Sequence, residues 1–185
     1  MSWNLVTLDE VKPTPWRNGG GVTRELLAWP QSGEWKLRIS IADVTADGPF
    51  SAFPGIERWF AVLEGEGVAL AIGGGTQRLT PRSPPLCFDG GLQADCRLLG
   101  GATRDFNLMA APGRARLSQV RGHAATHVRA PFLIAAYADR ARLAARFGSE
   151  DPVDVAPRTL AWRVVEQPAA FAVESQDALM MEVSL

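Results

Sequence analysis

Residues 58–72 read RWFAVLEGEGVALAI, two short runs of β-forming residues joined by a turn with two glycines. Runs of this kind, bounded by turn residues, are typical of strands in sandwiches and barrels. The 13 prolines and 18 glycines of the chain interrupt nearly every segment that could otherwise form a helix. In 35–44, hydrophobic and polar residues alternate as in a half-buried strand. The sequence therefore predicts an all-β fold, with strands over 35–44, 58–65, 67–72, 84–88, 96–100, 132–138, 139–147, 159–165, 169–173 and 179–185.

A weak internal repeat favours duplication of a smaller barrel. Residues 60–70 hold two strands and are followed by Leu79 and Leu86. Residues 132–143 hold two strands and are followed, at similar spacing, by Val153 and Leu160. Both halves thus run strand, turn, strand, loop, strand, turn, strand. We expect one unit over 1–185 built from two jelly-roll halves, approximately 1–110 and 111–185.

Composition excludes several classes of protein. The 185 residues carry a formal net charge of −1 and a pI near 6.1, so the charge gives no sign of a basic surface that binds nucleic acid. No apolar run approaches the roughly 20 residues of a membrane helix. The first residues also lack the pattern of a signal peptide. Cys87 and Cys96 are interpreted as reduced core cysteines, so we expect a cytoplasmic protein that binds neither membrane nor nucleic acid.

The stretch GPFSAFPGIERWFAVLEGEG (48–67) resembles the metal-binding motif of the cupins, which are small jelly-roll barrels. The resemblance implies a His-x-His pair near 51–54, where this chain has Ser-Ala-Phe-Pro. Arg58 stands where the cupin motif has its glutamate ligand, so a cation replaces a carboxylate. The only histidines, His123 and His127, are too few for a metal site by themselves. We expect neither a metal nor another cofactor.

Residues 15–26, PWRNGGGVTREL, form a second motif, and RDFNLM (104–109) forms a third. By itself the Asn-Gly step predicts no more than a tight turn. Taken with GPFSxFPGxxR, however, the motifs closely resemble the HutD/Ves family of bacterial cytoplasmic proteins. The resemblance implies a duplicated cupin-like (bicupin, RmlC-like) fold. One branch of that family is associated with histidine utilisation and with intermediates such as formiminoglutamate, whereas the other is labelled a stress-induced protein.

The motif residues suit a pocket for a small anion. A buried Arg58 needs an anionic partner, and a ligand carboxylate matches its planar guanidinium. Consecutive glycines let backbone N–H groups approach such a ligand. An ion pair of Arg58 with Glu25 or Asp105 is the structural alternative. The expected ligand-binding residues are Trp16, Asn18, Gly19, Gly20, Arg58 and Asn107, with supporting roles for Arg24, Glu25, Ser51 and Asp105.

The function favoured by these residues is non-enzymatic binding of a small carboxylate metabolite that modulates histidine utilisation. A metal-free hydrolase or isomerase is the alternative, with Glu25 or Asp105 as a base whose pKa burial has raised. The third hypothesis is a stress-related protein that acts through a protein partner. The sequence leaves open whether the chain forms a homodimer.

Overall fold

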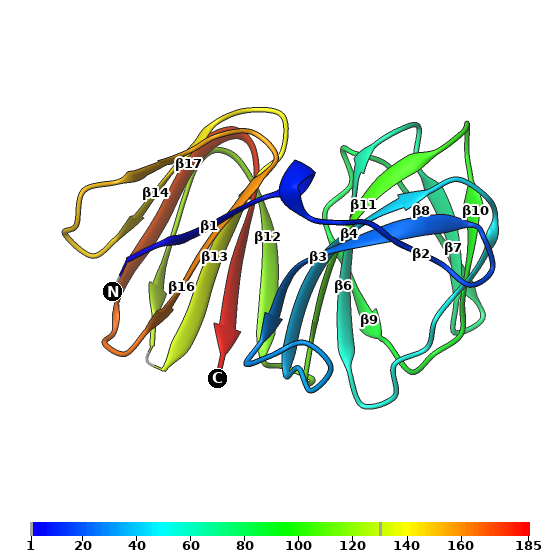
Figure 1. Cartoon of the computed structure of the whole chain (residues 1–185), viewed down its shortest axis with the longest axis horizontal. Helices are drawn as coiled ribbons and strands as arrows, with labels where there is room; N and C mark the ends of the chain where they lie inside the picture. The colour runs from blue at the N-terminus through cyan, green and yellow to red at the C-terminus, as the bar shows by residue number, and fades with distance from the viewer. Residues whose placement is uncertain (1, 130) are drawn as a thin grey trace. The chain divides into compact units, whose positions relative to one another are not determined.

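The computed structural model describes residues 2–129 and 131–185 (Figure 1). The chain forms two compact units. The N-terminal barrel consists of Lys12–Gly113, and the C-terminal barrel combines Met1–Val11 with Arg114–Leu185. The halves expected from the sequence meet near residue 110, whereas in the structure residues 2–11 belong to the C-terminal barrel.

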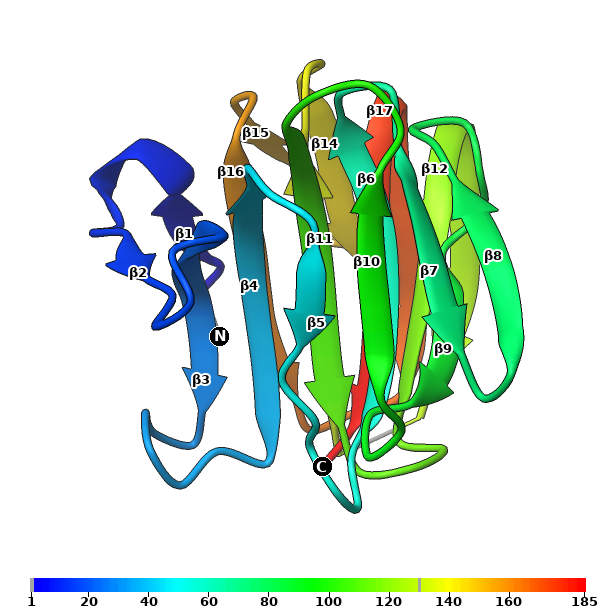
Figure 2. The same cartoon turned by 90° about the vertical axis from the view of Figure 1, so that its right-hand side faces the viewer.

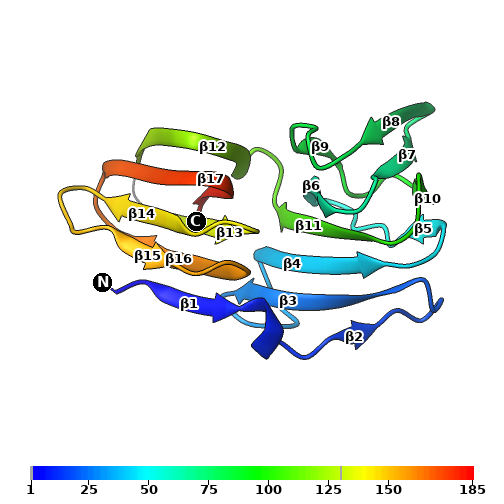
Figure 3. The same ribbon diagram turned by 90° about the horizontal axis from the view of Figure 1, so that it is seen from above.

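The N-terminal barrel consists of ten strands in two sheets. The six-stranded sheet has the order β2-β3-β4-β11-β6-β9, and the four-stranded sheet has the order β5-β10-β7-β8. The four-stranded sheet faces the viewer in Figure 2, and Figure 3 shows the two sheets as opposite walls. The strands are β2 (Thr14–Pro15), β3 (Gly21–Trp29), β4 (Leu37–Val44), β5 (Gly48–Phe50), β6 (Glu57–Glu64), β7 (Val68–Ile72), β8 (Gly75–Leu79), β9 (Leu86–Asp89), β10 (Ala94–Leu98) and β11 (Thr103–Ala110).

The C-terminal barrel holds a seven-stranded sheet in the order β1-β16-β13-β17-β14-β15, with β12 paired to β17. A short 3₁₀ helix, η1 (Leu8–Glu10), follows the first strand. The strands are β1 (Asn4–Thr7), β12 (Ala115–Val128), β13 (Phe132–Ala138), β14 (Leu143–Phe147), β15 (Val153–Val155), β16 (Thr159–Val165) and β17 (Ala169–Ser184).

The two barrels repeat one pairing scheme. In the N-terminal barrel β7 pairs with β8 and β6 pairs with β9. In the C-terminal barrel β14 pairs with β15 and β13 pairs with β16 in the same way. The long β17 takes the place of both β10 and β11. It pairs with β14 as β10 pairs with β7, and it pairs with β13 as β11 pairs with β6. The predicted all-β, duplicated jelly-roll fold is confirmed.

Alternation of side chains fills the interior of the N-terminal barrel. Even-numbered residues of β4 and β6, such as Phe60 and Val62, join side chains of the opposite sheet in one apolar cluster. This is the consequence of the two-residue period of a strand. The cluster consists of Ala42, Val44, Phe50, Phe60, Val62, Val68, Leu70, Leu79, Ala94 and Cys96.

Three sequence predictions need correction. The strand expected over 139–147 begins only at Leu143, because the preceding residues turn. The strands expected over 169–173 and 179–185 are one strand. The polar run between them continues the strand because Ser175 pairs with Leu143 of β14 and with Gly122 of β12. Cys96 is buried as expected, but Cys87 is exposed on β9.

Within residues 2–129 and 131–185, no helix has the length and apolar character needed to cross a bilayer.

The first prediction concerns the glycine triplet. A Cβ on Gly21 would lie 2.4 Å from the carbonyl oxygen of Asp43 and 3.3 Å from the ring of Trp16. A Cβ on Gly20 would come no closer than 3.4 Å to its nearest neighbour, the side-chain oxygen of Asn18. We expect Gly21→Ala to lower the free energy of unfolding by about 2 kcal/mol or more, because β3 and β4 must separate. Gly20→Ala, the matched control, should lose less than about 1 kcal/mol.

Urea denaturation of both variants measures the difference. Equal losses would show that strand spacing at Gly21 does not require glycine.

Candidate functional site

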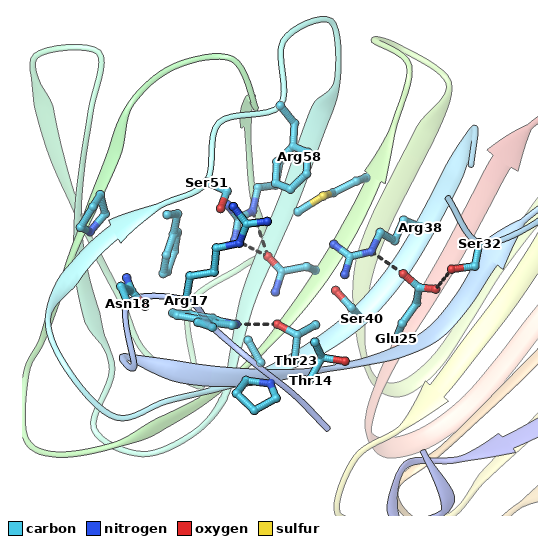
Figure 4. Close-up of a pocket in the computed structure, with 18 residues that line it drawn as sticks. Thr14, Arg17, Asn18, Thr23, Glu25, Ser32, Arg38, Ser40, Ser51 and Arg58 are labelled. Atoms are coloured by element: carbon cyan, nitrogen blue, oxygen red, sulfur yellow. Dashed lines mark hydrogen bonds and ion pairs between the residues drawn. The ribbon is translucent and has the colours of Figure 1, made fainter. Parts of the chain in front are cut away.

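A cavity of about 720 Å³ opens in the N-terminal barrel (Figure 4). Its wall combines the β2–β3 hairpin with inward-facing residues of β4, β5, β6 and β11. The lining residues are Thr14, Pro15, Trp16, Arg17, Asn18, Thr23, Glu25, Ser32, Arg38, Ser40, Ala42, Pro49, Phe50, Ser51, Phe53, Arg58, Asn107 and Met109.

Arg58 is a buried residue in the lining of the cavity. It lies on β6 two residues before Phe60, on the strand face that points into the barrel, and only 7% of it is exposed. Its Cζ lies 4.6 Å from the ring centroid of Phe50 and 5.7 Å from that of Phe88. Burial lowers the pKa of the guanidinium to about 10, so Arg58 remains a cation at neutral pH. The aromatic faces attract this cation without neutralising it.

Asn107 holds the Arg58 guanidinium in place. Its Oδ1 on β11 accepts hydrogen bonds from Nε at 2.9 Å and from Nη2 at 2.6 Å. Among the described residues, Nη1 of Arg58 and Nδ2 of Asn107 form no hydrogen bond, and both residues line the cavity. Asn107 therefore fixes one edge of the guanidinium and leaves the Nη1–Nη2 edge for another acceptor.

The ion pair considered as the structural alternative for Arg58 does not form. Glu25 accepts instead from Nε of Arg38 at 2.8 Å and from the hydroxyl of Ser32 at 2.9 Å. In the part of the chain that the structure describes, no carboxylate oxygen lies within 4.0 Å of the Arg58 nitrogens, and Asp105 interacts with Arg58 only through its longer-range field. The cation is thus buried with a neutral hydrogen-bond partner.

Two further arginines face the cavity that the sequence argument did not select. Arg17 follows Trp16 in the loop before β3, and Arg38 lies on β4 two residues before Ser40. Figure 4 shows both side chains directed into the cavity together with Arg58. Glu25 is the one acidic lining residue, so the lining carries three cations and one carboxylate. Arg38 belongs to the polar side of the alternation in 35–44, and the structure shows that this side faces the cavity.

Three more of the expected residues line the same cavity, namely Trp16, Asn18 and Ser51. The indole Nε1 of Trp16 donates to the hydroxyl of Thr23 at 2.8 Å, and its ring meets Phe50 edge-on. Trp16 thereby forms a fixed apolar wall beside the arginines. The Oδ1 of Asn18 accepts from the Gly20 amide at 3.0 Å.

Four expected residues do not line the cavity: Gly19, Gly20, Arg24 and Asp105. Gly19 has a φ of 72° in the turn before β3, and Gly20 accepts from the Thr45 amide at 2.9 Å. The glycines therefore shape the hairpin that carries Trp16. Arg24 points away from the cavity and forms an ion pair with Asp43 at 2.6 Å.

Asp105 is buried on the inward-facing side of β11, with none of its surface exposed. Its Oδ2 accepts from the Thr103 hydroxyl at 2.9 Å, whereas Oδ1 forms no hydrogen bond. Burial raises the pKa of Asp105 to about 7, although the Thr103 hydrogen bond and the field of Arg58 oppose that rise. Asp105 therefore titrates near neutrality.

The cavity residues do not fit the metal of typical cupins. At the predicted ligand positions the chain offers the Arg58 guanidinium, the Ser51 hydroxyl and the Phe53 ring. A guanidinium repels a metal cation, and a phenyl ring has no lone pair to donate. His123 and His127 are exposed on β12 in the C-terminal barrel. Across residues 2–129 and 131–185, no group of three His, Cys, Asp or Glu side chains is arranged to hold a metal.

The fold and the cavity define a cupin-like β-barrel protein with an arginine and neutral groups at the positions where the cupin motif has its metal ligands. Comparison with known proteins then gives the family. The HutD family profile matches residues 8–181, so the chain belongs to the HutD family, as the three sequence motifs predicted.

Bacterial relatives agree with this assignment. An uncharacterised 21.2 kDa protein from the hutC 3′ region of Pseudomonas putida is 44% identical over 116 residues, 60% of each chain. Protein Ves of Cronobacter sakazakii is 37% identical over 116 residues, 60% of this chain and 64% of Ves. The matched segment thus spans less than two thirds of these relatives. The solved structure of HutD from Pseudomonas fluorescens SBW25 is 27% identical, with a TM-score of 0.83 over 99% of this chain and 98% of that one.

The second prediction concerns Asp105 and stability. Because the pKa of Asp105 is higher in the folded barrel than its ordinary value of 3.8, the folded state holds a proton that the unfolded chain releases. This contribution to stability is present below about pH 4 and is lost as pH rises through about 7. Asp105→Asn should remove that loss, on the order of 2–4 kcal/mol. Urea denaturation of wild type and variant from about pH 4 to pH 8 tests this; parallel stability curves would contradict it.

Proposed function

We propose that the N-terminal barrel binds a small carboxylate metabolite and that the Arg58 guanidinium is its principal anchor. The observation that carries the proposal is the missing counter-ion: a guanidinium 7% exposed, inside a cavity, is bonded to the neutral oxygen of Asn107. A buried cation without a negative partner is costly. An anion from solution supplies that partner.

The free groups of the cavity favour a carboxylate in particular. Nη1 and Nη2 of Arg58 lie in one plane and match the two oxygens of a carboxylate. Nδ2 of Asn107 is a further donor beside them. A ligand group placed here meets donors, so it must be an acceptor. The ligand carboxylate would use the Nη1–Nη2 edge, since Asn107 occupies the Nε edge.

The rest of the cavity supports a glutamate derivative such as formiminoglutamate. A volume of about 720 Å³ lies in the usual range for small-molecule sites. The exposed Arg17 offers a second cation for a second carboxylate, and the Trp16 ring offers a wall for the methylene groups. The match to the HutD family, and the relative from the hutC 3′ region, support a role of this ligand class in histidine utilisation. The protein would modulate that pathway by binding an intermediate.

The groups around the cavity give less support to a metal-free enzyme. Asp105 has the elevated pKa of a general base, but it is fully buried and absent from the cavity lining. Glu25 lines the cavity, but it is engaged by Arg38 and Ser32. A general base must come within hydrogen-bond reach of the proton it removes. Neither Asp105 nor Glu25 is a free carboxylate that could reach a ligand bound to Arg58.

The third prediction tests the anchor. Wild-type protein should bind formiminoglutamate or a close N-acyl glutamate with a dissociation constant on the order of 10–1000 μM. Arg58→Lys should weaken binding about tenfold or more, because an ammonium lacks the planar pair of donors. Arg58→Ala should abolish detectable binding while the protein still folds. Calorimetric titration, with thermal melts of each variant, measures both effects.

Arg97→Ala is the matched control, since it removes an exposed arginine of β10 and the same charge. Its affinity should equal that of wild type. Unchanged binding in Arg58→Ala would show that Arg58 does not anchor the ligand. Equal losses of affinity in Arg58→Ala and Arg97→Ala would show that only the net charge of the protein matters.

The fourth prediction uses Asn107. Asn107→Asp places a carboxylate of nearly the same shape against Nε and Nη2 of Arg58. The internal ion pair should neutralise the cation and add repulsion toward a ligand carboxylate. We expect the dissociation constant to rise about tenfold or more with no loss of melting temperature. Tighter binding in Asn107→Asp would contradict a carboxylate at this position.

A further inference from the structure

A second ionisable group, Asp105, is buried in the same barrel as Arg58, outside the lining of the cavity. Asp105 lies on β11 two residues before Asn107, on the same inward-facing side of the strand. It is fully buried, it is absent from the cavity lining, and its Oδ1 has no hydrogen-bond partner. One buried carboxylate and one buried guanidinium therefore share a single barrel interior, within reach of each other's field, without forming a direct ion pair.

The charged and titratable groups that act on Asp105 come from three neighbouring strands. Arg58 of β6 attracts the carboxylate, and Asp43 of β4 repels it. The charge of Asp43 is largely compensated, because Arg24 and Arg104 bind its two oxygens at 2.6 and 2.7 Å. Cys96 of β10 also interacts electrostatically with Asp105. Burial raises the pKa of the Cys96 thiol to about 12, so the thiol stays neutral. Arg58 is the main uncompensated charge near Asp105.

We propose that Asp105 takes up a proton when a carboxylate ligand binds to Arg58, so that ligand capture by the N-terminal barrel is linked to pH. This inference rests on the proposed function, because it requires an anion at Arg58. Asp105 acts through Arg58 and not through contact with the ligand: in the empty cavity the field of Arg58 favours its ionised form, and the bound ligand carboxylate shifts it to the neutral form. No covalent step is involved, and the proton comes from solvent.

The physical reason is competition for one cation. In the empty barrel the field of Arg58 favours the ionised form of Asp105 against the cost of burial. A bound carboxylate compensates that field and adds a like charge nearby, and both effects favour the neutral acid. Protonation removes charge from Oδ1, which has no donor to stabilise it. The ligand-bound barrel therefore holds a proton more tightly than the empty barrel.

Linkage fixes the direction of the pH dependence. Because binding takes up a proton, affinity must fall as pH rises through the range in which Asp105 ionises. The change is at most tenfold per pH unit for a single proton. The carboxyl groups of N-acetylglutamate ionise well below neutrality, so the charge of this ligand stays constant over that range.

The test is calorimetric titration of the full chain with N-acetylglutamate between about pH 6 and pH 8.5. Each titration is run in two buffers with different ionisation enthalpies, so that the difference in heat counts the protons exchanged. We expect wild-type protein to take up a fraction of a proton per ligand near pH 7 and its dissociation constant to rise about tenfold across the range. Asp105→Asn should bind with a dissociation constant that does not change with pH.

Asp95→Asn is the matched control, since it makes the same change on an exposed residue of β10 whose side chain accepts only from Gln93. It should retain the wild-type pH dependence. Wild-type binding without proton uptake would overturn the linkage and leave the proposed function intact. No binding of N-acetylglutamate by wild type at any pH would overturn both. Should Asp105→Asn fail to fold, the buffer comparison on wild type decides the question.

Discussion

The Arg58 guanidinium is enclosed by the N-terminal barrel with aromatic rings on its faces, one amide oxygen on its edge and no carboxylate in contact. Burial of this cation is unfavourable, and the pKa lowered to about 10 records that cost. Two features of the site are consistent with this constraint. The neutral Asn107 orients the guanidinium without neutralising it, and the cavity gives an anion access to the free edge.

The other charges of the barrel are arranged so that Arg58 remains without an internal ion pair. Glu25, which shares the cavity, is bound by Arg38 and Ser32. Asp43 is bound by two arginines on the opposite side of the sheet. Asp105 is close enough to influence Arg58, but burial favours its neutral form. Glu25 and Asp43 are thus paired with other arginines, and Asp105 has a pKa near neutral pH. The positive charge of Arg58 therefore remains available to a ligand in the cavity.

Much of the fold could be predicted from the sequence because alternation and turn residues act locally. The spacing that links Leu79 and Leu86 to Val153 and Leu160 reflects a pairing scheme that the barrels share. The sequence analysis expected no strand where β12 lies, and it divided β17 into two strands. Both strands depend on pairing with partners far along the chain, which local patterns do not reveal.

The candidate site was predictable in part for the same reason. Arg58 could be located because its spacing within the motif fixes the strand face that it occupies. Arg38 and Arg17 were missed because strand alternation does not reveal whether a polar face meets solvent or a cavity. The pairing of Glu25 with Arg38 was equally hidden, since it depends on the register between β3 and β4.

A crystal structure of the full chain with N-acetylglutamate tests the central claim most directly. We predict a ligand carboxylate on the Nη1–Nη2 edge of Arg58 and within hydrogen-bond reach of Nδ2 of Asn107, while Oδ1 of Asn107 still accepts from Nε. A structure in which Arg58 has turned to form an ion pair with Asp105, with the ligand elsewhere or absent, would contradict the account.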